Sequence, residues 1–488
     1  MTATPPDPPP TGRQKGAKLF LLGSALAQIC ALARYVLLAR ILGPEQLGFA
    51  AILILTAQLF AASSDAGADR FVIQDSQGDE PEVQRLAQLV AVGRGSITAL
   101  GLAAVAYPIS LHYSNPTLGW ATLCLALSPF LLGFLHLDMR RQQRRRDFRA
   151  EGLGIITSEL AAFVVMGVAA WFLKSFIAVA FGLIARSLVM TITSHLTRER
   201  RYEIGFSKAH WPRLARFSAP LIANGMLLFL AGQGDRLVMA TTLGPADLGR
   251  YAAVMLLALY PTSLVMRYLS ATQLPKLAGA KADSARLGAE EGLLGGACLA
   301  FAAAIMTGYT LVGPYAVELL YGADFRLPTA VFALIAALQA GRMLRQWPTT
   351  AALALGRSGI VLTNNAVRAA SLPVAFVVAI QTKSLEGVLV ALVVGEVAAT
   401  IVALVMLRRA CAGPALSDAT RIAAFVGVAV LAWLWGVLPA LSGAWWAAAV
   451  ALAVFLGWIG RQEAPTLRLA AAILHNAIGR RRRTSPGK

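Results

Sequence analysis

The chain has 488 residues, of which 57% are hydrophobic and only 14% are charged, and its mean hydropathy is +0.63. Soluble domains carry roughly 25% charged residues, so this composition excludes an array of soluble domains and indicates an integral membrane protein. The formal net charge is +19. Because the basic residues lie mainly in alternate loops, this charge reports membrane topology, and we expect no nucleic-acid partner.

The cysteines lie far apart and lack the spacing of a metal site or a redox site. Most of them fall in apolar runs, where we interpret them as packing residues. We therefore expect no metal and no cofactor. The four residues are Cys30, Cys124, Cys298 and Cys411.

The N-terminal segment, residues 1–17, is rich in proline and also carries basic residues. Such a segment cannot bury a core, which predicts a disordered cytoplasmic tail. The apolar run that follows, from about Leu19 to Leu42, is longer than the hydrophobic core of a signal peptide. We interpret it as a first membrane span that the protein retains.

Apolar runs of about 20 residues between polar breaks predict an all-α polytopic membrane protein with about fourteen transmembrane helices. No polar segment between the runs is long enough to fold alone. This argues against a membrane-anchored polymerase, ligase or glycosyltransferase, and we expect a protein that is not an enzyme. The approximate limits of the runs are 18–42, 46–72, 83–111, 117–138, 151–173, 176–197, 214–243, 247–274, 287–316, 326–355, 358–381, 385–408, 420–440 and 443–460.

The distribution of basic residues tests this map independently through the positive-inside rule. Basic residues lie before the first run and after the fourth, sixth, eighth, tenth, twelfth and fourteenth runs, with the largest groups at 140–149, 198–213 and 480–483. Both termini are therefore expected in the cytoplasm. The basic tail, 463–488, contains a segment, Pro465–Ile478, whose pattern fits either a short helix on the membrane surface or an unstructured tail.

The segment from Arg34 to Ala51 returns in diverged form 201 residues later, from Asp235 to Ala252. Both copies keep the core Leu-Gly-Pro-x-x-Leu-Gly between apolar runs, which predicts a sharp reversal between two helices. The glycine takes the left-handed position that ends the first helix, and the proline suits the first turn of the next helix. The residues of these hairpin turns are Gly43, Pro44, Gly48, Gly244, Pro245 and Gly249.

The repeat predicts two related six-helix lobes in the same orientation, as in transporters that are built from parallel repeats. We expect the N-terminal lobe, with spans 1–6, at residues 18–213 and the C-terminal lobe, with spans 7–12, at residues 214–410. Spans 13 and 14 occupy residues 411–462, outside the two-lobe pattern. Substrate sites in such transporters lie between the lobes, near the middle of the membrane.

Ionisable residues deep inside the apolar runs are costly unless they face a cavity or a partner, and here most of them are arginines. An excess of arginine predicts a positively charged interior that suits an anion, because the guanidinium group binds phosphate through two parallel hydrogen bonds. For each single arginine, a structural ion pair or a side chain that reaches the membrane surface is an equally open interpretation. The candidate substrate-binding arginines are Arg34, Arg94, Arg186, Arg236, Arg267, Arg342, Arg345 and Arg368. The acids, which are candidates for a gate or for ion coupling, are Glu159, Asp235 and Glu396.

The repeat places opposite charges at equal depth, because Arg34 and Asp235 each lie nine residues before the glycine of their turn. This arrangement predicts one of two partners for Asp235. One is Arg34, in an ion pair across the two lobes that acts as an outer gate. The other is a local partner, such as Arg236 or a nearby hydroxyl group.

Arg342 and Arg345 share one helix face, where like charges repel. We therefore expect both side chains to face water or a bound anion. Pro261, Pro348 and Pro373 lie in neighbouring runs, and we expect these prolines to break helices around the same cavity.

Four short motifs occur in a defined order between about Leu19 and Arg409. They are Leu42-Gly-Pro-Glu-Gln-Leu-Gly48, Ser218-Ala-Pro-Leu-Ile-Ala-Asn-Gly225 leading to Asp235-Arg236, Leu243-Gly-Pro-Ala-Asp-Leu-Gly-Arg-Tyr251, and Leu320-Tyr-Gly-Ala-Asp-Phe325. In order and spacing they resemble the polysaccharide-type flippases of the multidrug/oligosaccharidyl-lipid/polysaccharide exporter superfamily, which includes membrane proteins of lipopolysaccharide and exopolysaccharide biosynthesis.

The resemblance implies a MATE-like fold that translocates an undecaprenyl-diphosphate-linked oligosaccharide across the bacterial cytoplasmic (inner) membrane by alternating access. The product would serve the synthesis of O-antigen or exopolysaccharide. In the related peptidoglycan-precursor flippases, arginines of spans 1 and 8 contact the diphosphate, and by position these roles fall to Arg34 and Arg267. The implied partners are this prenyl-diphosphate-linked oligosaccharide, membrane lipids, and polymerase or assembly proteins of the polysaccharide.

Two other functions stay open. A cation-coupled multidrug exporter on the same fold would depend on Glu159, Asp235 or Glu396 and would tolerate changes of the arginines. A membrane enzyme of polysaccharide assembly would need an acid, or a nucleophile with a base, at the membrane interface. The sequence contains no convincing pair of this kind.

Overall fold

The computed structural model describes residues 11–410, 415–438 and 457 of the chain. Every secondary-structure element of this part is a helix, which confirms the expected all-α class. The helices are α1 (Thr11–Ser63), α2 (Ala68–Gln74), α3 (Pro81–His112), α4 (Pro116–Leu125), α5 (Leu127–Gly133), α6 (Asp138–Arg144), α7 (Arg149–Leu173), α8 (Ile177–Leu196), α9 (Trp211–Thr242), α10 (Pro245–Gly279), α11 (Ser284–Tyr321), the 3-10 helix η1 (Ala323–Phe325), α12 (Thr329–Ala354), α13 (Ser358–Thr382), α14 (Leu385–Ala410) and α15 (Ala415–Val437).

The first thirteen expected spans each coincide with one of these helices, with part of one, or with consecutive ones. Eleven segments of the described part are long and apolar enough to cross a membrane, so the chain is a multi-pass membrane protein. The fourteenth expected span, 443–460, falls outside the described residues apart from Gly457, as does the whole tail segment 465–478. Helix α1 begins at Thr11, so residues 11–17 are helical, contrary to the expected disordered tail.

The glycines of the repeated turns both have positive φ, as predicted, but not in the left-handed helical region. Gly43 has φ 74° and ψ 177°, and Gly244 has φ 94° and ψ 171°. The extended ψ has a simple cause, because each glycine precedes a proline, and the proline ring disfavours helical ψ in the residue before it. The combination of positive φ and extended ψ is open essentially to glycine alone. Helical structure resumes at Pro44 within α1 and at Pro245 in α10.

The described helices form two compact units, which divide between Gln233 and Gly234, inside α9. We call the parts before and after this point unit 1 and unit 2. The first part of α9 packs in unit 1, where Ser218 Oγ donates a hydrogen bond to Ala66 O at 2.6 Å. The expected lobe boundary, between residues 213 and 214, lies near the start of α9 and about twenty residues before the division of the units, because the sequence gives no sign that one helix contributes to both units.

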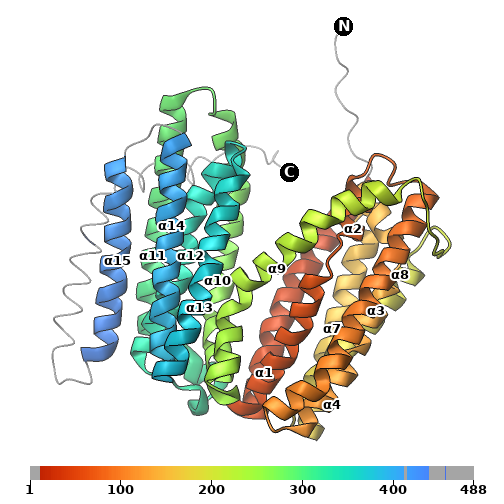
Figure 1. Ribbon diagram of the computed structural model, residues 1–488, viewed down its shortest axis with the longest axis horizontal. Helices are drawn as coiled ribbons and strands as arrows, with labels where there is room; N and C mark the ends of the chain where they lie inside the picture. Colours follow the sequence, from red (N-terminus) through yellow and green to blue (C-terminus); the bar gives the residue numbers. More distant parts are fainter. Residues whose placement is uncertain (1–10, 411–414, 439–456, 458–488) are drawn as a thin grey trace, which may run out of the picture. The chain divides into compact units, whose positions relative to one another are not determined.

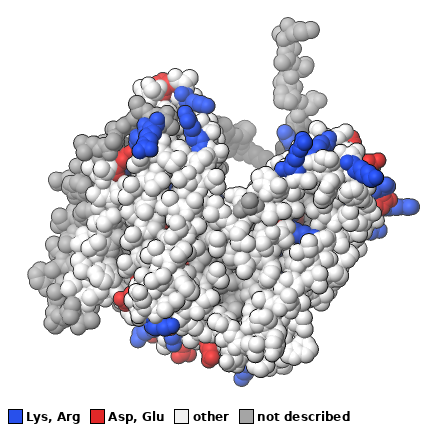
Figure 2. Space-filling model, in the orientation of Figure 1, with Lys and Arg blue, Asp and Glu red and all other residues white. Residues whose placement is uncertain are grey.

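Each unit is a bundle of helices that run side by side (Figure 1). In unit 1, α7 packs against α1 and α8, and α3 packs against α4 and α5. In unit 2, α12 packs against α10, α11, α14 and α15, and α13 packs mainly against α14. In Figure 2 the flanks of the helices are almost free of charged side chains on the visible face, and the charges gather at the helix ends. Large apolar side chains along the helices, such as Leu100 of α3 and Val312 of α11, are exposed, as expected for contact with lipid.

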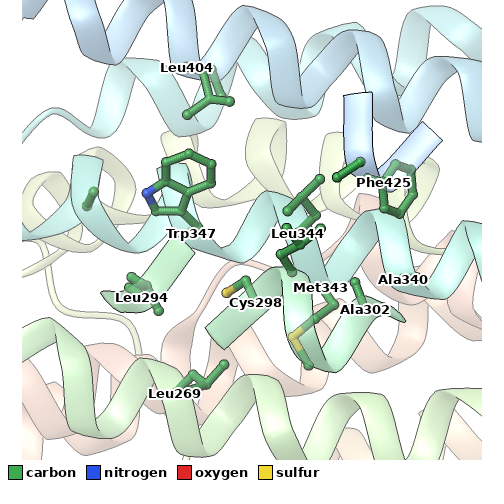
Figure 3. Close-up of a cluster of buried hydrophobic side chains, with 14 of the residues drawn as sticks. Leu269, Leu294, Cys298, Ala302, Ala340, Met343, Leu344, Trp347, Leu404 and Phe425 are labelled. Carbon is green, nitrogen blue, oxygen red and sulfur yellow. The ribbon is translucent and has the colours of Figure 1, made fainter. Parts of the chain in front are cut away.

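Helix α12 is the core of unit 2. Most of its side chains are buried, including Met343, Leu344 and Trp347, which pack with Cys298 of α11 and Phe425 of α15 (Figure 3). It is not among the eleven segments that are apolar enough to cross a membrane, although the sequence predicts a span at 326–355. A helix that protein surrounds can carry polar residues that a lipid-facing helix cannot.

Helix α15, the expected span 13, packs on unit 2 through charged groups as well as apolar ones. Arg408 of α14 donates to Asp418 of α15 at 2.6 Å and to Glu291 of α11 at 2.7 Å. Arg421 of α15 lies over the Trp347 ring, with its guanidinium carbon 5.0 Å from the ring centroid. Within unit 2, α15 is therefore a docked part of the bundle.

The helix breaks lie in unit 1 and not at the expected prolines. The chain leaves helical structure at residues 64–67, between α1 and α2, and again at residues 134–137, between α5 and α6. Helices α10, α12 and α13 continue through Pro261, Pro348 and Pro373, so the expected breaks at these prolines are wrong. A proline removes one backbone hydrogen bond, and membrane helices tolerate this loss when neighbouring groups compensate for it.

Candidate functional site

In unit 1, three of the expected residues meet at one carboxylate. Glu159 of α7 is buried and accepts hydrogen bonds on both oxygens: from Arg34 Nη1 of α1 at 3.0 Å and from Arg186 Nε of α8 at 2.6 Å. The Arg34 side chain is 16% exposed, whereas that of Arg186 is 49% exposed. Two guanidinium groups against one carboxylate leave this group with one excess positive charge.

In unit 2, three arginines and two acids form a larger network. Glu396 of α14 accepts hydrogen bonds from Arg345 Nε of α12 at 3.0 Å and from Arg368 Nε of α13 at 2.6 Å. Arg342 Nε lies 3.5 Å from Glu396 Oε1, and Arg342 Nη2 lies 3.3 Å from Asp235 Oδ2. Arg342 therefore joins the two carboxylates, and the network also carries one excess positive charge.

Asp235 has a hydroxyl partner as well. The Tyr251 hydroxyl of α10 donates to Asp235 Oδ2 at 2.7 Å, and the backbone N–H of Arg236 donates to Asp235 Oδ1 at 2.9 Å. Tyr251 is fully buried. The alternative of a local hydroxyl partner therefore describes Asp235 in this structure, and the ion pair with Arg34 across the lobes stays a prediction.

A carboxylate of the protein itself offsets the repulsion between Arg342 and Arg345. Both guanidinium groups lie within 3.5 Å of Glu396, which α14 brings against α12. From the sequence we expected water or a bound anion in this place. That expectation missed Glu396 because the carboxylate lies 51 residues beyond Arg345, on another helix.

The charged pairs of the two units belong to matching hairpins. Helices α7 and α13 each have 25 residues, and each ends at a lysine in the left-handed conformation: Lys174 with φ 47° and ψ 36°, and Lys383 with φ 49° and ψ 29°. Each lysine is followed by serine, and the next helix, α8 or α14, begins within two residues of that serine. Glu159 lies ten residues after the start of α7, and Arg368 lies ten residues after the start of α13.

The polarity of the pair is reversed between the two hairpins. In unit 1 the first helix carries the acid, Glu159, and the second carries the arginine, Arg186. In unit 2 the first helix carries the arginine, Arg368, and the second carries the acid, Glu396. In both hairpins an arginine Nε donates to a glutamate Oε1 at 2.6 Å.

The remaining expected arginines have different surroundings. Arg94 of α3 forms an ion pair with Asp65, with 3.2 Å between Arg94 Nη1 and Asp65 Oδ1. Arg236 is partly buried beside Asp235. Arg267 lies on an exposed face of α10, and no ion pair or hydrogen bond within the described part of the chain involves its side chain.

Two contributors were missed by sequence reasoning: Tyr251 and Asp65. Tyr251 stands in the second copy of the repeat, where the first copy has an alanine, so a search for shared residues passes over it. Asp65 lies at the helix break between α1 and α2, inside a run that reads as one continuous span. The signal that was available is the charge itself, since any aspartate within an apolar run needs a partner.

The arrangement neutralises most of the buried charge and offers N–H donors of the kind that bind anions. Five arginines, Arg34, Arg186, Arg342, Arg345 and Arg368, surround three carboxylates in membrane-spanning helices. Each guanidinium group has five N–H donors, so the carboxylates do not use all of them. Within the described residues, no group of three or more His, Cys, Asp or Glu side chains could hold a metal ion.

Solved structures share the fold. The chain is similar to the lipid II flippase MurJ in an inward closed conformation, with a TM-score of 0.67, 13% identity, and coverage of 92% of this chain and 99% of that chain. It is also similar to an inward-facing multidrug resistance MATE family transporter of the MOP superfamily, with a TM-score of 0.61, 14% identity, and coverage of 82% and 95%. At these identities the likeness concerns the fold alone.

Curated relatives come from polysaccharide pathways. The succinoglycan biosynthesis transport protein ExoT of Rhizobium meliloti is 27% identical over 47% of this chain and 46% of its own length. The lipopolysaccharide biosynthesis protein WzxC of Escherichia coli is 25% identical over 56% of this chain and 56% of its own. The chain thus spans about half the length of the curated relatives it matches.

The family assignment rests on a longer match. Residues 37–327, more than half of the chain, match the family described as polysaccharide biosynthesis protein. This match covers all four motifs that carry the resemblance to polysaccharide-type flippases, and it begins within the first copy of the repeat. It shows that the chain belongs to the polysaccharide biosynthesis protein family.

Proposed function

We propose that the protein is a flippase that translocates an undecaprenyl-diphosphate-linked oligosaccharide across the bacterial inner membrane for cell-surface polysaccharide synthesis. The transport proceeds by alternating access through an arginine-lined cavity, with both termini in the cytoplasm. The observation that carries the proposal is the excess of arginine around Glu159, Asp235 and Glu396 in both units. A fixed positive charge inside the membrane lowers the barrier for a diphosphate, which cannot cross hydrocarbon alone.

The same contacts bear on the alternative of a cation-coupled exporter. Such a protein needs a carboxylate that is free to exchange a proton or a metal ion. Here each of the three intramembrane carboxylates already accepts contacts from one or more guanidinium groups. These internal cations occupy the positions that a coupling ion would take, which supports transport of an anionic headgroup over export of cations.

Arg267 offers the cleanest test of the proposal. It lies in α10, and within the described residues its side chain has no ion pair that a substitution would break. Loss of transport in Arg267→Ala therefore reports on substrate, whereas loss in Arg34→Ala also includes the cost of leaving Glu159 with one partner. Arg357→Ala, at the N-terminal cap of α13, is a matched control, because Arg357 is also exposed.

The experiment measures translocation of a radiolabelled prenyl-diphosphate oligosaccharide in proteoliposomes that contain the full chain. We expect transport by the wild type and by Arg357→Ala, and at least a tenfold lower rate in Arg267→Ala and in Arg342→Ala/Arg345→Ala. The proposal fails if the wild type moves no such lipid but exports organic cations in a pH-dependent or sodium-dependent way. It also fails if Arg267→Ala, Arg342→Ala/Arg345→Ala and Arg357→Ala all transport at the wild-type rate.

A further inference from the structure

Unit 1 contains a cavity of about 230 Å³ where its two helix breaks come together. Its lining includes Ala61 and Asp69 on either side of the break at residues 64–67, and Leu135 and Leu137 from the break at residues 134–137. Irregular backbone at the edge of a membrane is tolerated where it is buried in protein or lines a cavity. The two breaks and the cavity are therefore parts of one feature.

Two arginines line this cavity. Arg94 and Thr98 come from α3, four residues apart and so on one helix face, and Arg140 comes from α6. The Arg140 Nε atom is buried and has no hydrogen-bond partner within the described part of the chain. The single acid in the lining, Asp69, lies 3.9 Å from Arg140 Nη2. Outside the lining residues, Glu151 accepts a hydrogen bond from Arg140 Nη1 at 2.5 Å and Asp65 pairs with Arg94, so the two arginines offer a ligand their remaining N–H donors and not an unbalanced charge.

The walls of the cavity are held in place by close packing. A Cβ atom added to Gly95 of α3 would lie 2.6 Å from Pro129 O and 2.8 Å from the Cα of Gly133, so α3 and α5 cross in contact here. On another side, Ala68, Val72, Ala87 and Leu137 form a buried apolar cluster that fixes α2 and the second break against α3. The cavity is therefore a preformed site rather than a gap between loose helices.

We infer that this cavity binds the phosphate of a lipid headgroup. Arginine binds phosphate through charge-assisted hydrogen bonds, and the apolar lining of alanine, leucine and proline suits the glycerol or prenyl carbons next to it. Pockets that enclose whole drug-sized molecules measure about 300–1,000 Å³, so this smaller volume fits a headgroup and not an oligosaccharide.

The depth of the cavity agrees with this ligand. The membrane-spanning segments Leu26–Ser63 and Pro116–Gly133 both end beside it, next to the basic segment 140–149. By the positive-inside rule this end faces the cytoplasm. The cavity then lies at the level of the lipid phosphates of the cytoplasmic leaflet, where basic pockets recruit anionic headgroups.

Two kinds of lipid can supply this phosphate, a prenyl diphosphate or an ordinary phospholipid. A substitution of Asp69 distinguishes between them. A second negative charge next to Asp69 would be repelled, whereas the ammonium group of phosphatidylethanolamine would be attracted. Asp69→Asn is therefore expected to strengthen binding of a prenyl diphosphate and to weaken binding of phosphatidylethanolamine.

The test titrates the full chain, in a neutral detergent, with geranylgeranyl diphosphate, phosphatidylglycerol and phosphatidylethanolamine, and with geranylgeraniol as the phosphate-free control. Arg94→Gln is expected to lower the affinity for the preferred phosphate-bearing probe at least tenfold. Arg70→Gln is the matched control, because Arg70 pairs with the same Asp65 at 3.2 Å but does not line the cavity, and we expect its affinity to stay within twofold of the wild type. Ala61→Phe, which fills the cavity without changing a charge, is expected to reproduce the loss.

Equal affinities in Arg94→Gln and Arg70→Gln would overturn the inference, and so would binding of geranylgeraniol as tight as that of the phosphate-bearing probes. The result is independent of the transport assay. A protein that binds these probes through Arg94 but moves no lipid-linked oligosaccharide would sustain this inference and defeat the proposed function. A protein that transports such a lipid, but whose Arg94→Gln variant binds the probes as tightly as the wild type, would sustain the proposed function and defeat this inference.

Discussion

Glu159 and Arg368 occupy the same position in two matching helices, ten residues after the start of α7 and of α13, and carry opposite charges. Each pairs with a residue of the following helix through a 2.6 Å bond from arginine Nε to glutamate Oε1. The geometry of the hairpin has been kept between the units while the charges have been exchanged.

The two glutamates should differ in their contribution to stability. Removing one partner from a buried ion pair costs about 3–5 kcal/mol, because the other charge stays buried and unpaired. Glu396 has three guanidinium groups within 3.5 Å, of which none is more than 14% exposed, whereas one of the two partners of Glu159 is half exposed. We expect Glu396→Gln to lower the thermal unfolding temperature in detergent more than Glu159→Gln does, and equal shifts would contradict this ranking.

The Tyr251 hydroxyl should contribute measurably to the network in unit 2. It is fully buried and donates to Asp235 at 2.7 Å. A hydrogen bond to a charged group contributes about 1.5–3 kcal/mol, so Tyr251→Phe should destabilise unit 2 by that order. Tyr268→Phe is the control, since the Tyr268 side chain is 60% exposed, and it should leave the unfolding temperature unchanged. A Tyr251→Phe protein as stable as the Tyr268→Phe protein would show that the bond is dispensable.

The glycine of the first turn should resist substitution for reasons of backbone conformation alone. A Cβ atom on Gly43 would meet nothing within 4 Å, yet φ 74° with ψ 177° is closed to other residues. We expect Gly43→Ala to cost about 1–3 kcal/mol. Gly308→Ala, within α11 and also with open space around the added Cβ atom, should instead be neutral or stabilising by up to about 1 kcal/mol. Comparing the unfolding temperatures of the two variants separates strain from crowding.

Lowering the pH should destabilise the protein through His136 and Asp138, which lie where the chain passes from α5 to α6. Burial lowers the pKa of His136 and outweighs the Asp138 carboxylate, which raises it. Burial alone would raise the pKa of Asp138, but hydrogen bonds from Arg141 and the backbone N–H of Glu199 lower it below its ordinary value. Both shifts act in the same direction, because the unfolded chain binds more protons at either residue than the folded protein does.

The His136 contribution is complete above its ordinary pKa of 6.5 and is lost as the pH falls below that value. The Asp138 contribution is lost only at lower pH, below its ordinary pKa of 3.8. We expect the unfolding temperature to fall between pH 7.5 and pH 5, and His136→Gln to reduce that slope. His112→Gln, at the end of α3, should keep the wild-type slope, and an identical slope in all three proteins would rule out His136 as its source.

The sequence predicts the helices well, because in a membrane protein the apolar run and the helix have nearly the same length. It also predicts the repeated turn, since a glycine before a proline allows few conformations. It does not predict the breaks at residues 64–67 and 134–137. At residues 134–137 the apolar composition continues, and at residues 64–67 the polar stretch is too short to end the predicted span at 46–72. Contacts such as the hydrogen bond from Ser218 Oγ to Ala66 O stabilise the irregular backbone.

The sequence indicates which charged residues to consider for the candidate site, but not which arginine pairs with which acid. The cost of buried charge identifies Arg34, Arg186, Arg368 and the three acids from composition alone. Which arginine meets which acid depends on how helices pack, and the separations range from 27 residues for Arg186 with Glu159 to 125 for Arg34 with Glu159. A search for identical residues also passes over the matching hairpins, because their charges are opposite.

The reversed polarity means that the two hairpins cannot be exchanged, although their backbones match. If the α7–α8 hairpin stood in place of α13–α14, Arg186 would take the place of Glu396 beside Arg342 and Arg345. If α13–α14 stood in place of α7–α8, Arg368 would face Arg34. Docking of either hairpin in the wrong half of the chain would therefore bury like charges together, which disfavours misassembly of the two similar pieces.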